Sequence, residues 1–154
     1  MADYIAFNEG RQEVWAIDRG GDVSFGTSYF MLSVRDVNTH VVTDTLSGTG
    51  FGEANGVTAS TGYSRQSQST PAATSNNPAS VAFSQMSWAT GANTDWPSFC
   101  KSVVLCTVPS YSSSGGVTAK GICAWNLQAG GTPRNMAQAN TTEQFTPLLL
   151  IGYV

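Results

Sequence analysis

The sequence is poor in charged residues of both signs. They make up only 11% of the 154 residues, less than half the usual fraction for a soluble domain. Seven are basic, scattered from Arg11 to Arg134, and the formal net charge is −3. Non-specific nucleic-acid binding needs clustered basic side chains, because counterion release from phosphates supplies most of its affinity. The pattern therefore argues against nucleic acid as a partner.

Long apolar runs are also missing. The longest one near the end of the chain, residues 148–151, is far shorter than the roughly 20 residues that a membrane-spanning helix requires. The N-terminus lacks the basic segment and following apolar stretch of a secretory signal. We therefore expect a soluble protein that is made in a cytoplasm and has no membrane partner.

Cysteine and histidine are scarce as well. The three cysteines, Cys100, Cys106 and Cys123, are odd in number, and without a secretion signal we expect them to be free, buried thiols. His40 is the single histidine, in a β-branched stretch where we expect a sheet or surface position. The sequence contains no Cys-x-x-Cys pair and no Gly-x-Ser-x-Gly elbow. It therefore predicts no enzyme, no cofactor and no metal site.

Ser, Thr and 16 Gly take the place of charge, and these residues suit turns and the exposed faces of strands. We predict a single all-β domain over residues 1–154, an antiparallel sandwich or barrel. Residues 1–20 form a short N-terminal helix, which Asn8 can cap, or an arm. The expected strands are 29–34, 40–46, 55–63, 81–88 with a bulge, 103–108, 122–127 and 145–154, and the expected surface loop is 65–78.

Apolar side chains in two places are candidates for partner binding. Tyr4, Ile5, Phe7 and Trp15 lie in the N-terminal segment, where a small sandwich has no evident need for them. Trp96 is the tryptophan that we expect to be most exposed, because it precedes a proline. The four tryptophans otherwise suit a core, and an exposed sugar-binding platform is the alternative.

The chain from residue 46 onward carries a series of short motifs. Leu46-Ser47 and Glu53 come first, Gly62-Tyr-Ser-Arg-Gln66 follows, and Trp88 comes later. The further motifs are Asp95-Trp-Pro97, Ser102-Val-Val-Leu105, Gly121–Leu127, Gly130-Gly131, Arg134-Asn-Met136 and Ala139–Glu143. In this order they resemble a loose group of small virion proteins of tailed bacteriophages, over residues 46–154.

This resemblance implies a structural role in the virion and no enzymatic activity. The favoured function is capsid decoration, in which copies bind the outside of the shell of major capsid protein and help it resist the pressure of packaged DNA. A mildly acidic chain suits that exterior location. The resemblance also implies a homo-oligomer, with a trimer expected. The alternatives are a minor tail or tail-tip protein, a carbohydrate-binding module for host attachment and, last, a hydrolase.

Arg65 is the candidate partner-binding residue of the signature Gly62-Tyr-Ser-Arg-Gln66. Tyr63 and Arg65 are two residues apart, so on a strand they point to the same face. A guanidinium presents five donors in a rigid fork and is costly to bury unpaired. Arg65 therefore either braces its own chain at the edge of the loop 67–78 or pairs with a carboxylate of a neighbouring subunit.

Overall fold

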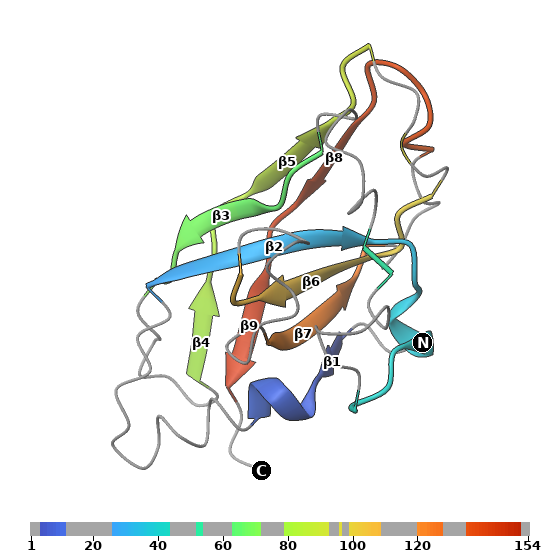
Figure 1. Cartoon of the computed structure of the whole chain (residues 1–154). Coiled ribbons are helices and arrows are strands. Elements are labelled where there is room, and N and C mark those ends of the chain that lie inside the picture. Colours follow the sequence, from blue (N-terminus) through green and yellow to red (C-terminus); the bar gives the residue numbers. More distant parts are fainter. Residues whose placement is uncertain are drawn as a thin grey trace.

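The protein is built from antiparallel strands, as the composition predicts. The computed structural model describes residues 4–11, 26–43, 52–53, 63–71, 79–92, 96, 99–108, 120–127 and 135–151. Figure 1 shows the main sheet, whose five strands follow the order β1 (Tyr4–Ala6), β7 (Gly121–Asn126), β6 (Ser102–Cys106), β2 (Thr27–Ser33) and β3 (Gln66–Ser69).

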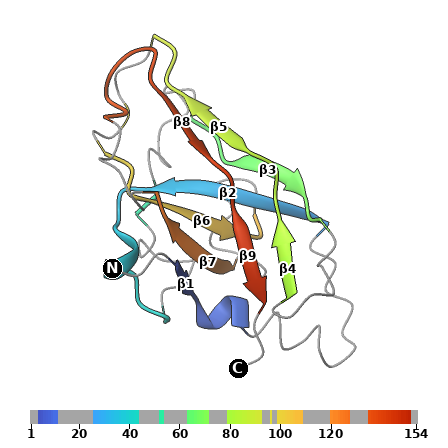
Figure 2. The same cartoon turned by 180° about the vertical axis from the view of Figure 1, so that it is seen from behind.

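A long two-stranded ribbon runs across this sheet. Its strands pair antiparallel, β4 (Ala79–Ala82) with β9 (Leu148–Ile151) and β5 (Met86–Ala89) with β8 (Thr142–Phe145). Between the two pairs, the N–H of Phe83 donates to the carbonyl of Pro147 at 3.1 Å, so one pair continues into the other. Figures 1 and 2 show β5 and β8 on the side of the sheet where β3 lies.

The larger core cluster lies between the ribbon and the sheet. The Phe30 ring of β2 meets the Phe83 ring edge-on, with 4.9 Å between their centroids. Nε1 of Trp125 in β7 donates to the carbonyl of Leu148 at 3.0 Å. These two contacts attach the ribbon to the sheet. The other buried members of the cluster are Leu32, Val81, Met86, Trp88, Trp96, Cys100, Val103, Leu105, Ile122, Cys123 and Met136.

A smaller core cluster covers the opposite face of the sheet. Met31 of β2 and Val104 of β6 project into it, and they pack with Phe7 and with Val37 of the 3-10 helix η1 (Val37–Thr39). Alternate residues of β6 face the larger cluster, so this strand is buried on both faces. The uninterrupted apolar run of its sequence predicts that burial.

The strands expected at 29–34, 103–108 and 122–127 are present, and the last two pair with each other as β6 and β7. The prediction of a strand at 40–46 is wrong for residues 40–43, the part of it that the structure describes, because these residues are not in a strand. The carboxylate of Asp36 accepts the N–H of Asn38 at 2.9 Å, which caps η1 immediately before that stretch. The expected strand at 55–63 lies almost wholly outside the described residues.

Two further predictions are corrected where the ribbon and the sheet edge form. The expected bulged strand 81–88 is two strands, β4 and β5, and the slip in alternation between Phe83 and Met86 is the break between them. The expected last strand is likewise divided, because Pro147 separates β8 from β9 and a proline has no N–H for a ladder. The expected loop 65–78 contains β3, which pairs with β2 in continuous register.

The N-terminal segment belongs to the fold in its described part. Residues 4–6 form β1, at the edge of the sheet opposite β3, and Phe7 is fully buried. A helical turn occupies residues 8–11, and the N–H of Arg11 donates to the carbonyl of Phe7 at 3.0 Å. The prediction that Tyr4, Ile5 and Phe7 stand on a free arm is therefore wrong, although Tyr4 keeps 36% of its surface exposed. Trp15 lies outside the described residues.

Gly10 offers a test of this attachment, because a Cβ at this position would lie 2.3 Å from the carbonyl oxygen of Ile122 in β7. Gly10→Ala should force the turn away from the sheet and lower the free energy of unfolding by about 1–3 kcal/mol, as overpacking does. The carbonyl of Phe7 accepts the first hydrogen bond of the turn, so Asn8 is not its N-cap, contrary to the prediction from the sequence. Asn8→Ala, at an exposed position of the same turn, should change the free energy of unfolding by less than about 0.5 kcal/mol. Urea unfolding measures both, and equal stabilities would contradict the attachment.

All three cysteines are buried and free, as the sequence predicts. Burial raises the pKa of Cys100 to about 12 and that of Cys106 to about 11. It also raises the pKa of Cys123 far above its ordinary value. The folded protein therefore keeps its thiols protonated, and a protonated, buried thiol is a poor nucleophile.

The thiols should therefore react only after unfolding. Iodoacetamide at neutral pH should leave the native protein unmodified, whereas mass spectrometry of the denatured, unreduced protein should show three modified cysteines.

The raised pKa of Cys106 also makes stability depend on pH. It stabilises the folded protein fully below the unfolded-state pKa of 9.0, and this contribution is lost as the pH rises toward the folded-state pKa of about 11. The free energy of unfolding should thus fall over that interval, and less steeply in Cys106→Ala. An identical pH dependence in the variant would contradict this assignment.

Candidate functional site

The signature motif folds into a buried ion pair. Glu53 forms an isolated bridge with Ser33 at the end of β2, and Arg65 comes immediately before β3. Nε of Arg65 donates to Oε1 of Glu53 at 2.7 Å, and Nη2 donates to Oε2 at 2.5 Å. Nη1 donates to the carbonyl of Val108 at 2.9 Å. The guanidinium therefore ties together three segments that are far apart in the sequence.

This ion pair is almost completely withdrawn from water. The side chains of Arg65 and Glu53 expose 1% and 5% of their surfaces. Burial lowers the pKa of Arg65, but the hydrogen bonds to Glu53 and the nearby charges more than offset that effect, so the pKa lies above its ordinary value. The bidentate geometry supplies the strong, charge-assisted hydrogen bonds that a buried guanidinium requires.

Tyr63 and Trp96 complete the cluster. The hydroxyl of Tyr63 donates to Oε1 of Glu53 at 3.2 Å and accepts the backbone N–H of Leu32 at 3.1 Å. Its ring stands edge-on to Trp96, with 5.3 Å between the centroids. Burial and the charge of Glu53 raise the pKa of Tyr63 well above its ordinary value. We call Glu53, Tyr63, Arg65 and Trp96 the Arg65 brace.

The brace decides between the two roles that the sequence left open for Arg65. The intrachain role is confirmed, and Tyr63 and Arg65 do point to a common side, since both contact Glu53. Direct contact of Arg65 with a partner is wrong, because its side chain is almost wholly buried. The expectation that Trp96 is exposed is also wrong. Its exposure is 4% because it lies in the larger core cluster against Tyr63.

His40, the one histidine of the sequence, is packed inside the protein. Its Nε2 lies 3.3 Å from Oγ of Ser102, and that hydroxyl donates to the carbonyl of Arg35 at 2.8 Å. The Phe7 ring stands edge-on to the imidazole, 5.6 Å away. An enzymatic role would gain from His40 beside a Cys or Asp in a cleft. The contacts of His40 with Ser102, which is fully buried, and with Phe7 join the end of η1 to the sheet.

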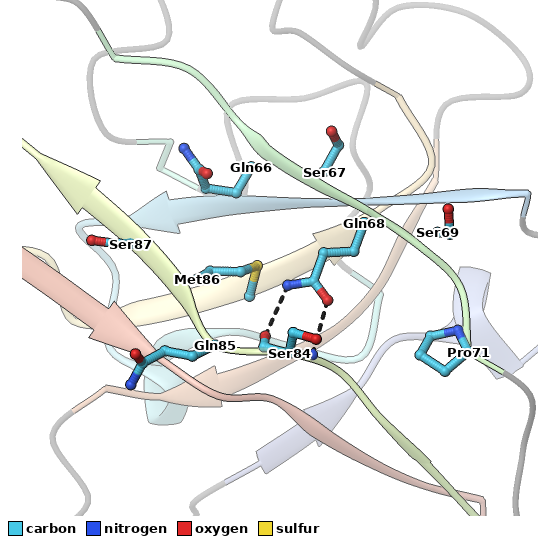
Figure 3. A pocket seen from close by; sticks show the side chains of 9 residues that line it. All are labelled: Gln66, Ser67, Gln68, Ser69, Pro71, Ser84, Gln85, Met86 and Ser87. Carbon is cyan, nitrogen blue, oxygen red and sulfur yellow. Dashed lines mark hydrogen bonds between the residues drawn. The ribbon is translucent and has the colours of Figure 1, made fainter.

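An open groove of about 640 Å³ separates β3 from β5 (Figure 3). Across it, Nε2 of Gln68 donates to the carbonyl of Ser84 at 2.8 Å, and the N–H of Ser84 donates to Oε1 of Gln68 at 2.9 Å. The side-chain amide thus pairs with this backbone as a neighbouring peptide group would. The residues that line the groove are Gln66, Ser67, Gln68, Ser69, Pro71, Ser84, Gln85, Met86 and Ser87.

The groove is neutral in its described lining. Those residues include neither an ionisable nor an aromatic side chain, so they present hydroxyls, amides and strand backbone together with the apolar Pro71 and Met86. A sugar-binding platform would need exposed aromatic rings, and the lining does not supply them. The sequence interpretation missed the groove because it treated residues 65–78 as a loop. The alternation of Gln and Ser over 66–69 was the available signal, since strands have a period of two.

Comparisons of the chain with protein-family models, with curated proteins and with solved structures found no match. Within the described ranges, no helix has the length and apolarity needed to cross a membrane. Among the same residues, no group of three or more His, Cys, Asp or Glu side chains is placed to hold a metal ion.

Removing either partner of the Arg65–Glu53 ion pair should lower the free energy of unfolding strongly. Glu53→Gln leaves a buried cation without its counter-charge, and the free energy of unfolding should fall by about 3–5 kcal/mol. Arg65→Lys should also destabilise, because a single ammonium cannot replace the bidentate fork and the bond to Val108. Urea unfolding monitored by tryptophan fluorescence measures both effects.

Two controls make this test specific. Arg11→Lys, at an exposed position, should change stability by less than about 0.5 kcal/mol. The double variant Glu53→Gln/Arg65→Met removes both charges and should be less destabilised than the sum of its single variants. Additive effects would show that Arg65 and Glu53 do not act as a pair.

Proposed function

We propose that the protein is a structural binding protein of a tailed-phage virion, and specifically a capsid decoration protein on the outside of the shell. The observation that carries this proposal is the use of the signature. Its Tyr63 and Arg65 lie in a buried brace with Glu53, so the motif that underlies the resemblance maintains the fold. Such a motif is expected in a protein whose task is to hold a shape and present a surface.

The surface chemistry agrees with adhesion on the exterior of a particle. The chain is mildly acidic and has few charges, which lowers the cost of removing its surface from water at a contact. The proposed partners are the major capsid protein and further copies of this chain. A minor tail protein would use the same surface, and locating the protein on intact particles by imaging separates head from tail.

Exposed apolar side chains near the β1 edge are the proposed shell contact. Tyr4 and Leu148 expose 36% and 48% of their surfaces, and both adjoin Trp125. The Tyr4 ring lies 5.9 Å from the Trp125 ring, and the carbonyl of Leu148 accepts the indole N–H. The rigid core beneath them leaves these side chains little conformational freedom to lose on binding.

Co-sedimentation of the purified protein with undecorated shells tests this function. The wild-type protein should sediment with shells, and Tyr4→Ser should bind about tenfold or more weakly, since a buried aromatic anchor carries about 2 kcal/mol or more. Phe99→Ser removes an exposed aromatic side chain at another place and should bind as the wild type does. Circular dichroism checks that each variant is folded. Failure of the folded wild-type protein to bind shells would refute the decoration role.

A further inference from the structure

The outer edge of β3 has few of the features that usually protect a sheet edge. Among the strands that the structure describes, β3 is the last of the main sheet on its side, and its register with β2 runs without a bulge from Gln66 to Ser69. Edge strands are commonly protected from pairing with another chain by charged side chains, prolines or bulges. Residues 66–69 contain no charge and no proline, and Pro71 lies beyond the end of the strand.

The neighbouring groups keep this edge straight and neutral. Arg65, the nearest cation in the sequence, turns inward to Glu53. The hydroxyls of Ser28 and Thr70 lie 2.7 Å apart and extend the β2–β3 pairing past the end of β3. On the other side, Gln68 is clamped to the backbone of Ser84. The strand is therefore fixed in an extended conformation before any partner arrives, which reduces the entropy cost of pairing.

The groove leaves room beside this edge. Ser67 and Ser69 are exposed on the β3 side, as are Ser84 and Ser87 on the β5 side (Figure 3). An occupant must be extended, because it adds to a strand. It must also be uncharged, because none of the described lining residues carries a charge that could neutralise it. Residues 66–69 of the chain meet both requirements, so the strand that lines the groove also has the chemistry to fill it.

We propose that β3 is a self-association site, at which two copies of the chain pair β3 with β3 in antiparallel orientation about a two-fold axis. Each copy places the edge of its β3 along the groove of the other. Antiparallel pairing of one edge with its own copy is isologous and closes at a dimer, in place of the trimer that the resemblance implies. The ten strands of the two main sheets then form one continuous sheet. Ser and Gln side chains face each other across the axis without charge repulsion.

Sedimentation velocity over a range of concentrations tests the proposal on the purified chain. The wild-type protein should pass from monomer to dimer as its concentration rises. Ser67→Lys places like charges near the axis and should weaken the dimer by about tenfold or more. Asn8→Lys adds the same charge at an exposed position beyond β1, at the opposite edge of the sheet, and should leave the dimer unchanged. A wild-type protein that stays monomeric, or forms a trimer, overturns the proposal.

Site-specific cross-linking shows whether β3 itself is the interface. The native thiols are buried, so an introduced surface cysteine responds alone to mild oxidation. Ser67→Cys, close to the two-fold axis, should give a disulfide-linked dimer, and Asn8→Cys, at an exposed position beyond β1 at the opposite edge of the sheet, should not. Equal cross-linking at both positions, or at neither, would place the contact elsewhere and refute the assignment. The proposed self-association is tested independently of the proposed shell binding, because the samples contain no shells. Either proposal can therefore fail without the other.

Discussion

The buried ion pair between Arg65 and Glu53 is the constraint on which one side of the fold depends. A charge withdrawn from water needs its counter-charge and its remaining hydrogen-bond partners in place together. Glu53 arrives from the segment beside the end of β2, Arg65 from the residue before β3, and the carbonyl of Val108 from the chain after β6. All three segments must therefore be in place in the folded protein, and the position of Arg65 fixes where β3 begins.

The sheet edge follows from that closure. With Arg65 held inward, the next residues continue outward as β3, and the Gln68 amide meets the backbone of Ser84 between the two halves of the ribbon. The ribbon is attached again at Phe83 and at Leu148, through Phe30 and Trp125. One side-chain amide, one aromatic ring pair and one indole hydrogen bond thus relate the ribbon to the sheet.

The distribution of chemistry in the molecule bears on its function. The most reactive side chains lie inside the protein and stabilise the fold. They are His40, the three cysteines and the ion pair of Arg65 and Glu53. The described surface carries, beside charged residues such as Arg11 and Asp36, neutral hydroxyls and amides along β3 and β5 and scattered apolar side chains such as Tyr4 and Leu148. Both kinds of surface suit contact between proteins, which is why adhesion and self-association are the proposed activities.

The sequence by itself determined the all-β class, the two-sided burial of β6 and the burial of the thiols. Each of these depends on local pattern, such as a continuous apolar run or a composition rich in Ser and Thr. The sequence also left two roles open for Arg65. A buried guanidinium requires hydrogen-bond acceptors, but the sequence does not reveal whether they belong to the same chain or to a neighbouring subunit.

Only the tertiary structure decided the rest, because those features depend on which distant segments meet. The sequence alone shows no structural reason for the N-terminal apolar residues. In the structure Tyr4–Ala6 pair with β7, and Phe7 packs in the smaller core cluster. Trp96 looked exposed beside its proline until Tyr63 packed against it. The neutral stretch 66–69 has the composition of a loop, and it is a strand because β2 offers its backbone hydrogen bonds in register. Local sequence does not encode such partners, since strand pairing satisfies backbone groups that every residue carries.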